Sequence, residues 1–158
     1  MSENEKYLTD ATLARLAKWL RMLGYDTAVF TRVAGREMLR LADAEQRIVL
    51  TRRQDMRQRQ FSGILYLVSS KDTGSQLKEV ITNFSLKIEK KRMFQICLKC
   101  NARLLSIEKE EVRDFVPLYV FANYSEFTWC PHCRSIYWPG THQRNSLQFL
   151  EKLSIVPV

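Results

Sequence analysis

Two patterns in this 158-residue sequence predict an α/β fold: a domain with a mainly parallel sheet, followed by a small unit built on four cysteines. Over residues 1–90, short apolar runs typical of buried strands alternate with segments whose apolar residues recur at helical spacing. Over residues 91–158, all four cysteines of the chain fall in two Cys-x-x-Cys pairs. Length and a hydrophobic content of 46% are enough for a real core and allow either one domain of average size or two small ones. From the two patterns we expect two units joined near residue 90.

The first predicted helix follows a short strand at residues 6–9. It begins at Asp10, and either Thr9 or Asp10 can cap it. Gly24 ends the helix, because glycine readily adopts the left-handed conformation found after many helices. Apolar residues at intervals of three and four predict one buried face, formed by Leu13, Leu16, Ala17, Leu20 and Leu23. Basic residues recur on another face, at Arg15, Lys18 and Arg21.

The remaining elements continue this alternation. We predict strands at residues 27–31, 48–51 and 64–68, and helices at residues 36–45, 73–84 and 145–153. Strands that alternate with helices form a mainly parallel sheet with helices on both faces, which gives three layers.

Polar residues follow three of the predicted strands. In a parallel α/β sheet, ligands bind beyond the carboxyl ends of the strands, so these residues are candidates for one site. They are Asp10 after the first strand, Arg52, Arg53 and Asp55 after the third, and Ser69, Ser70 and Asp72 after the fourth. Carboxylates gathered there would suit Mg²⁺ or Mn²⁺, which prefer oxygen ligands and activate water in two-metal nucleases. Taken alone, the position of Asp10 favours a helix cap.

The cysteine pairs Cys97/Cys100 and Cys130/Cys133 predict one structural zinc ion. Each Cys-x-x-Cys loop brings two thiolates to one ion, and four thiolates complete a tetrahedron with no position open for catalysis. The alternatives are two disulfides or four reduced thiols in a core. The first residues are polar and charged, unlike an export signal, and no apolar run is long enough to span a membrane. We therefore expect a cytoplasmic protein with reduced thiols, which favours zinc.

The charge of the chain is unevenly distributed. The formal net charge is +8, and residues 1–92 hold 18 Lys/Arg against 11 Asp/Glu, whereas residues 93–158 hold 7 against 6. A basic first unit favours an anionic partner, of which nucleic acid is the commonest. Within it, glutamines that can bond phosphate or ribose separate a cluster of arginines: Arg47, Arg52, Arg53, Arg57 and Arg59. We expect the cluster to contact RNA, and the alternative is a solvated basic face. Residues 90–92 extend this stripe or form a solvated linker.

The second unit carries further candidates for ligand contact, namely Tyr137, Trp138 and His142. Aromatic side chains on such a unit can stack on unpaired bases. The alternative is that Tyr137 and Trp138 pack it onto the first domain, which we favour for Trp138. His132 lies between the second pair of cysteines, but four cysteines leave it no ligand position. Residues 108–115 form a charged helix or loop to which we assign no chemistry.

An ordered set of motifs resembles one known family over most of the chain. Residues 7–27, YLTDATLARLAKWLRMLGYDT, closely resemble the opening of the Mut-seven C-terminal RNase domain family. Further matches follow in order at residues 50–52 (LTR), 76–80 (QLKEV), 97–101 (CLKCN), 130–133 (CPHC) and 136–142 (IYWPGTH). The resemblance implies a PIN-like nuclease domain of three layers, then a zinc ribbon, with RNA as the substrate class.

The resemblance carries over unevenly at the acids. Asp10 matches the first acid of the family. The family usually has an aspartate near the start of the second helix, where this chain has Gly35, with Glu37 two residues on. It also usually has one directly after Thr-Arg, where this chain has Arg53 and only then Asp55. An arginine there puts a cation where a divalent metal would bind.

Three hypotheses follow. In the first, the chain is an RNA-binding protein with an altered acidic site, and its partner is structured RNA such as ribosomal or transfer RNA, or a ribonucleoprotein such as the ribosome. The residues expected to contact RNA are Arg15, Lys18, Arg21, Arg52, Arg53, Arg57, Arg59, Tyr137 and His142. In the second, it is a metal-dependent endoribonuclease that uses Asp10, Glu37 and Asp55 with Mg²⁺ or Mn²⁺. In the third, it is an antitoxin-like or assembly partner that binds protein through the ribbon.

Overall fold

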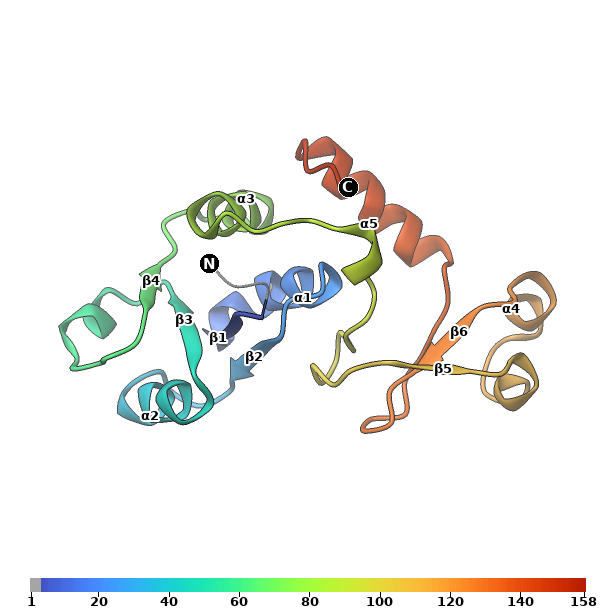
Figure 1. Cartoon of the computed structure of the whole chain (residues 1–158), viewed down its shortest axis with the longest axis horizontal. Coiled ribbons are helices and arrows are strands. Elements are labelled where there is room, and N and C mark those ends of the chain that lie inside the picture. Colours follow the sequence, from blue (N-terminus) through green and yellow to red (C-terminus); the bar gives the residue numbers. More distant parts are fainter. Residues whose placement is uncertain (1–3) are drawn as a thin grey trace.

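Four parallel strands form the sheet of the N-terminal unit in the computed structural model, which describes residues 4–158 (Figure 1). They are β1 (Lys6–Asp10), β2 (Thr27–Phe30), β3 (Arg47–Thr51) and β4 (Leu65–Leu67). Their order is β2-β1-β3-β4, and every neighbouring pair is parallel. The predicted parallel sheet is therefore confirmed. Each of the four strands differs by one residue, at one end or at both ends, from the range we predicted.

Helices cover both faces of this sheet. Successive strand residues point to opposite faces, so Tyr7 packs with α1 (Ala14–Met22) and α3 (Thr73–Phe84), whereas Leu8 packs with α2 (Arg36–Glu45). The predicted apolar face of α1 is fully buried. A short 3-10 helix (Ala11–Leu13) leads from β1 into α1. The three predicted layers are thus present.

Position 24, just after the end of α1, requires glycine for two reasons. Its φ of 92° lies in the left-handed region. A Cβ atom at this position would also collide with the backbone carbonyl of Arg92 in the linker between the units. The linker can therefore pass directly over the end of α1.

The second unit is a small antiparallel ribbon. Its strands β5 (Leu105–Ile107), β6 (Phe127–Trp129) and β7 (Ile136–Tyr137) pair in that order. A long insertion between β5 and β6 contains a 3-10 helix (Lys109–Val112) and α4 (Leu118–Asn123). Trp138 packs on Phe127 of the ribbon, with ring centroids 6.4 Å apart, in a cluster that includes Val112 and Val120. The prediction that Trp138 packs the ribbon onto the first domain is therefore wrong.

The last helix returns to the first unit. α5 (Thr141–Lys152) begins four residues earlier than predicted and buries Leu150 in the core cluster that contains residues of α1 and α3. Phe149 stacks on Trp19 of α1, with ring centroids 4.8 Å apart. We predicted this helix as part of the second unit, yet its apolar residues complete the core of the N-terminal unit. No described helix combines the length and the apolar content that a bilayer span requires.

Candidate nucleic-acid interface and metal centre

The four cysteines converge on one point of the ribbon. Their sulfur atoms all lie within 4.8 Å of one another, with Cys97 Sγ 3.5 Å from Cys133 Sγ and Cys100 Sγ 3.3 Å from Cys130 Sγ. A tetrahedral zinc site with Zn–S bonds of ~2.3 Å would have sulfur atoms about 3.8 Å apart. All four are free thiols, so the disulfide alternative is excluded. The cluster therefore fits a single divalent metal ion.

Two turns of the same geometry carry these sulfur atoms. In the first turn, the Cys97 N–H donates to the Ala102 carbonyl (2.7 Å) and the Asn101 N–H donates to the Cys97 carbonyl (2.9 Å). Cys130 makes the equivalent bonds with the residues four and five positions on, at 2.8 and 2.9 Å. Asn101 and Arg134 occupy the same place in their turns and both have positive φ, 68° and 63°. The ribbon thus presents two preformed metal-binding turns.

Tyr137 supports the metal centre rather than an exposed surface. Its hydroxyl lies 3.2 Å from Cys97 Sγ and accepts a hydrogen bond from the Leu98 N–H at 3.2 Å. Its ring is partly buried. In contrast, His142 is exposed in the first turn of α5, and His132 is exposed outside the sulfur cluster. Of the two residues of the second unit that we predicted to contact RNA, only His142 is exposed.

The first metal-binding turn is docked on the N-terminal unit. Asn101 accepts a hydrogen bond from the Thr27 N–H (2.9 Å) and donates one to Asp26. Arg21 donates to the carbonyl of Thr27 (2.7 Å) and to that of Leu98 (2.8 Å). Only 6% of Arg21 is exposed, so the prediction that it contacts RNA is wrong in this structure. Burial lowers the pKa of Arg21, whereas the nearby sulfurs of Cys100 and Cys97 act in the opposite direction.

Asp10 lies at the carboxyl end of β1, where the sequence predicts a site. Only 3% of it is exposed. One carboxylate oxygen accepts hydrogen bonds from the N–H and the hydroxyl of Thr12, and the other accepts one from the hydroxyl of Thr51 at the end of β3. Asp10 therefore caps the turn that leads into α1, as its position suggested, and joins two strand ends.

Of the two places where the resemblance implies acids, Arg53 occupies one and the side chain of Arg59 lies beside the other, at Gly35. Arg53 forms a two-point ion pair with Asp55, at 3.1 and 3.0 Å, and donates to the Ala34 carbonyl at 3.1 Å. At Gly35, an added Cβ atom would lie 3.6 Å from Nη2 of Arg59. Positive charge therefore stands at both positions.

The third candidate acid is engaged as well. Glu37 pairs with Arg32 at 2.9 Å, and the Glu37 side chain is 61% exposed. Across residues 4–158, the cysteines form the only group of three or more metal-ligating side chains whose donor atoms come together. Asp10, Glu37 and Asp55 do not form such a group in this structure.

The residues after β4 are held by an acid that sequence reasoning missed. Glu79 of α3 accepts hydrogen bonds from the N–H groups of Ser69 and Ser70 (2.9 Å each) and from the hydroxyls of Ser69 and Tyr66. Burial alone would raise the pKa of Glu79, but these hydrogen bonds outweigh it and lower the pKa to about 2. Asp72 caps α3 by accepting the Ser75 N–H at 2.9 Å, which lowers the Asp72 pKa. These side chains therefore order the loop after β4.

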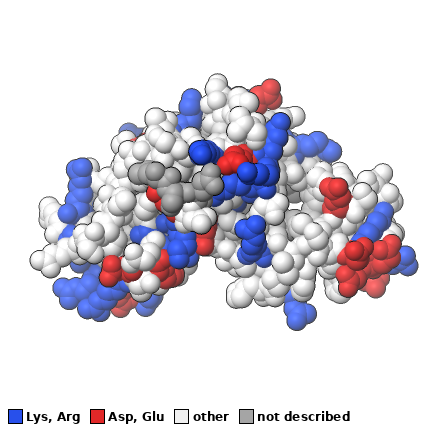
Figure 2. All heavy atoms as spheres, in the orientation of Figure 1, with Lys and Arg blue, Asp and Glu red and all other residues white. Residues whose placement is uncertain are grey.

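A basic surface surrounds the carboxyl edge of the sheet beside α2. Arg52, Arg53, Arg57 and Arg59 are all exposed in or beside the 3-10 helix Gln54–Gln58. α2 adds Arg36 and Arg40, which the sequence analysis did not select; with Arg59 they line a pocket of about 550 Å³. Figure 2 shows blue atoms gathered at this end of the molecule, with red atoms among them. On α1, Arg15 and Lys18 are exposed as predicted.

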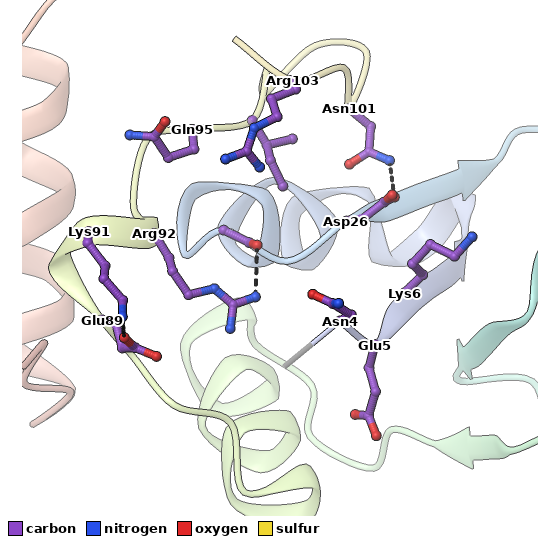
Figure 3. A pocket seen from close by; sticks show the side chains of 12 residues that line it. Asn4, Glu5, Lys6, Asp26, Glu89, Lys91, Arg92, Gln95, Asn101 and Arg103 are labelled. Atoms are coloured by element: carbon purple, nitrogen blue, oxygen red, sulfur yellow. Dashed lines mark hydrogen bonds and ion pairs between the residues drawn. The ribbon is translucent and has the colours of Figure 1, made fainter. Parts of the chain in front are cut away.

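A second pocket, of about 530 Å³, lies at the opposite edge of the sheet, where β1 begins (Figure 3). The linker between the units forms one wall of it, and Asn101 forms part of another. Many of its charged groups pair within the protein: Lys91 with Glu89 at 2.9 Å, and Asp26 with Asn101 and Arg47. This pocket marks the junction of the units and not the predicted site.

The fold and the site together define an α/β protein with a four-stranded parallel sheet, an arginine-rich carboxyl edge and a four-cysteine ribbon. Residues 5–150 match the family model described as the Mut7-C RNAse domain, and the chain belongs to that family. The resemblance noted from the motifs is thereby confirmed, and membership indicates a nuclease or RNA-related function. Neither the curated proteins nor the solved structures gave a match.

Proposed function

We propose that this Mut7-C RNAse-domain protein binds structured RNA, such as ribosomal or transfer RNA, or a ribonucleoprotein such as the ribosome. The binding surface is the arginine-rich carboxyl edge of the sheet. The observation that carries the proposal is the placement of Arg53 on both oxygens of Asp55 and of Arg59 over Gly35. Arg53 replaces one residue at which a nuclease of this family would be expected to hold a carboxylate, and the Arg59 guanidinium lies beside the other, Gly35.

Electrostatics favour phosphate over a divalent cation at this edge. Two like unit charges ~4 Å apart repel by about 4 kcal/mol at the effective dielectric of a protein surface. A divalent ion beside Arg53 would meet a repulsion of that order or more, and it would also have to displace the arginine from Asp55. Arginine binds phosphate through two parallel hydrogen bonds, and each contact releases counterions from the RNA. The arginines that repel a catalytic metal ion therefore raise the affinity of this surface for RNA.

We assign the four-cysteine site a structural role in this RNA-binding protein. Four thiolates are the ligand set typical of structural zinc, which supplies folding free energy and no chemistry. The sulfur geometry fits such an ion. Reduced thiols are typical of the cytoplasm, where we expect the protein to act.

Salt dependence of RNA affinity tests the proposal. Transfer RNA and a single-stranded oligonucleotide of the same length would be titrated by fluorescence anisotropy between 50 and 200 mM salt. When a protein binds several phosphates, its affinity falls by about 10³-fold or more over this range. We expect Arg52→Gln/Arg57→Gln to weaken binding of the transfer RNA and to reduce the log–log slope by about 1.5. Lys78→Gln/Lys152→Gln removes two exposed charges from α3 and α5 and serves as the control. Equal slopes for the wild type and the arginine variant would remove this edge from the interface.

The second candidate function is a metal-dependent endoribonuclease that uses Asp10, Glu37 and Asp55. It is favoured by Asp10, which stands at the end of β1 where the family has its first acid. Its test is cleavage of the same RNAs with Mg²⁺ or Mn²⁺. Cleavage that is lost in Asp10→Asn, while RNA binding is kept, would establish the enzyme and overturn the proposal of an altered site.

A further inference from the structure

The insertion between β5 and β6, residues 108–126, forms a rigid projection from the ribbon. We refer to it as the acidic arm. Val112 and Val120 are fully buried and pack against Phe127 and Trp138 of the ribbon. The 3-10 helix of the arm begins with a capping box, in which the Glu111 carboxylate accepts the Glu108 N–H. The arm therefore shares a core with the ribbon, and its surface residues have defined positions.

Three large apolar side chains of the arm face solvent. Phe115 is 76% exposed, Leu118 is 85% exposed and Tyr119 is 66% exposed. They lie within five residues of one another, around Pro117 at the start of α4. The neighbouring Val120 is fully buried, so the fold has buried one apolar side of this short helix and left the other open. An exposed apolar group of this kind, bordered by charge, is typical of a protein interaction site.

The charge around this patch is negative in a basic protein. The arm holds five acids against two bases, whereas the whole chain has a formal net charge of +8. All five acids are exposed: Glu108, Glu110, Glu111, Asp114 and Glu126. The two bases lie against one aromatic ring, with Lys109 Nζ 4.8 Å and Arg113 Cζ 5.1 Å from the centroid of Phe121. Figure 2 shows a compact group of red atoms at the end of the molecule where Figure 1 places α4, far from α2.

We propose that the acidic arm docks a basic protein segment that carries one or two large apolar residues. The apolar residues of the partner would cover Leu118, Tyr119 and Phe115, and its lysines or arginines would pair with the surrounding carboxylates. RNA is disfavoured as the occupant, because phosphates would meet the five carboxylates. The chain would then hold RNA at one end and a basic protein at the other. This docking does not depend on whether the carboxyl edge of the sheet binds or cleaves RNA.

A defined peptide library tests this surface on the intact, metal-loaded protein. Random 16-residue peptides displayed on phage would be selected on the wild type, and the enriched peptides would be synthesised and titrated against three proteins. These are the wild type, Leu118→Asp/Tyr119→Asp, and Val156→Asp as a matched control, since Val156 is 75% exposed outside the arm. All three changes are at exposed positions, and circular dichroism melts would verify that each variant folds.

We expect the enriched peptides to carry net positive charge and large apolar residues. Their affinity should fall by at least about tenfold in the arm variant and remain unchanged in the control, as expected for truncation of central anchor residues. Peptides that bind the arm variant equally well, a failure to enrich any peptide, or enrichment of acidic peptides would each overturn the proposal. Two other results would also overturn it by assigning the face to another occupant. One is a concentration-dependent dimer in sedimentation that the arm variant abolishes, and the other is a loss of transfer RNA affinity in the arm variant.

Discussion

Individual carboxylates at the strand ends of this protein are held by hydrogen bonds within the fold. Asp10 caps the 3-10 helix that follows β1, and Asp72 caps α3. Glu79 accepts backbone N–H groups of the loop between β4 and α3. Capping depends on residues two or three positions away, so position in the sequence was enough to suggest it for Asp10. Glu79 instead binds Ser69 and Ser70, which lie ten and nine positions before it in the sequence. Helical periodicity contains no signal for such a contact.

Glu79 makes the stability of the protein depend on pH at the acid end. Its pKa is lowered from 4.5 to about 2 in the folded state. A group with a depressed folded pKa stabilises the fold above its unfolded pKa, and that contribution is lost as the pH falls from about 4.5 to about 2. We expect Glu79→Gln to lower the free energy of unfolding at pH 7 by about 1 kcal/mol, since solvent screens a partly exposed group. The difference from the wild type should vanish near pH 2.

Thermal melts of the two proteins between pH 2 and pH 7 measure this difference. Glu37→Gln is the control, because the exposed Glu37 pairs only with the exposed Arg32 in the interactions described here. A Glu79→Gln deficit that stays constant down to pH 2 would mean that the carboxylate charge is not what holds the loop.

At the scale of elements, the central feature is the contact between the first metal-binding turn and β2. β2 is an edge strand of the sheet, and an edge strand leaves backbone groups without partners in the sheet. The side chain of Asn101 accepts a hydrogen bond from one of these groups, the Thr27 N–H, and Arg21 donates one to the Thr27 carbonyl. The turn from the ribbon therefore covers the start of this strand.

Local patterns could predict the elements but not this contact. Alternation of strands and helices predicted the parallel sheet, and paired cysteines predicted the metal-binding cluster, because both depend on short-range spacing. Arg21 falls on the basic stripe of α1 with Arg15 and Lys18, so periodicity predicted that it is exposed. The loop that covers it lies 77 residues away at Leu98, and only the tertiary fold brings it there. For the same reason, the return of α5 into the first core could not be predicted.

Replacement of Asn101 tests the contact between the elements. Asn101→Ala loses the hydrogen bonds to Thr27 and Asp26 and places alanine at a positive φ that asparagine tolerates better. We expect a loss of about 2 kcal/mol in urea unfolding, together with faster amide exchange at the start of β2. Arg134→Ala is a matched control, since Arg134 has the same backbone conformation in the second turn. Equal losses in the two variants would show that the turn conformation matters and the contact with β2 does not.

On the scale of the whole molecule, the ribbon is bound to the first unit at more than one place. The first metal-binding turn docks on β2, the linker passes over the end of α1, and α5 adds Leu150 to the core cluster that contains residues of α1 and α3. The end of the chain also pairs with the linker, because the Val158 N–H donates to the Ile88 carbonyl and the Val158 carbonyl accepts the Lys90 N–H, each at 2.9 Å. Residues from the second half of the chain therefore complete the core of the first unit, and the two units should unfold together.

Removal of the metal should consequently destabilise both units. Metal binding to a structural four-cysteine site contributes folding free energy, and the docked turn transmits its loss to β2. We expect a chelator to lower the melting temperature by about 10 °C or more, and renewed addition of Zn²⁺ to restore it. The three tryptophans allow each unit to be followed separately, since Trp19 lies on α1 whereas Trp129 and Trp138 lie in the ribbon. Their indole N–H signals in nuclear magnetic resonance spectra should disappear over the same temperature range in the chelated protein. If the Trp19 signal instead persisted to the melting temperature of the loaded protein while the ribbon signals were lost, the units would be energetically independent.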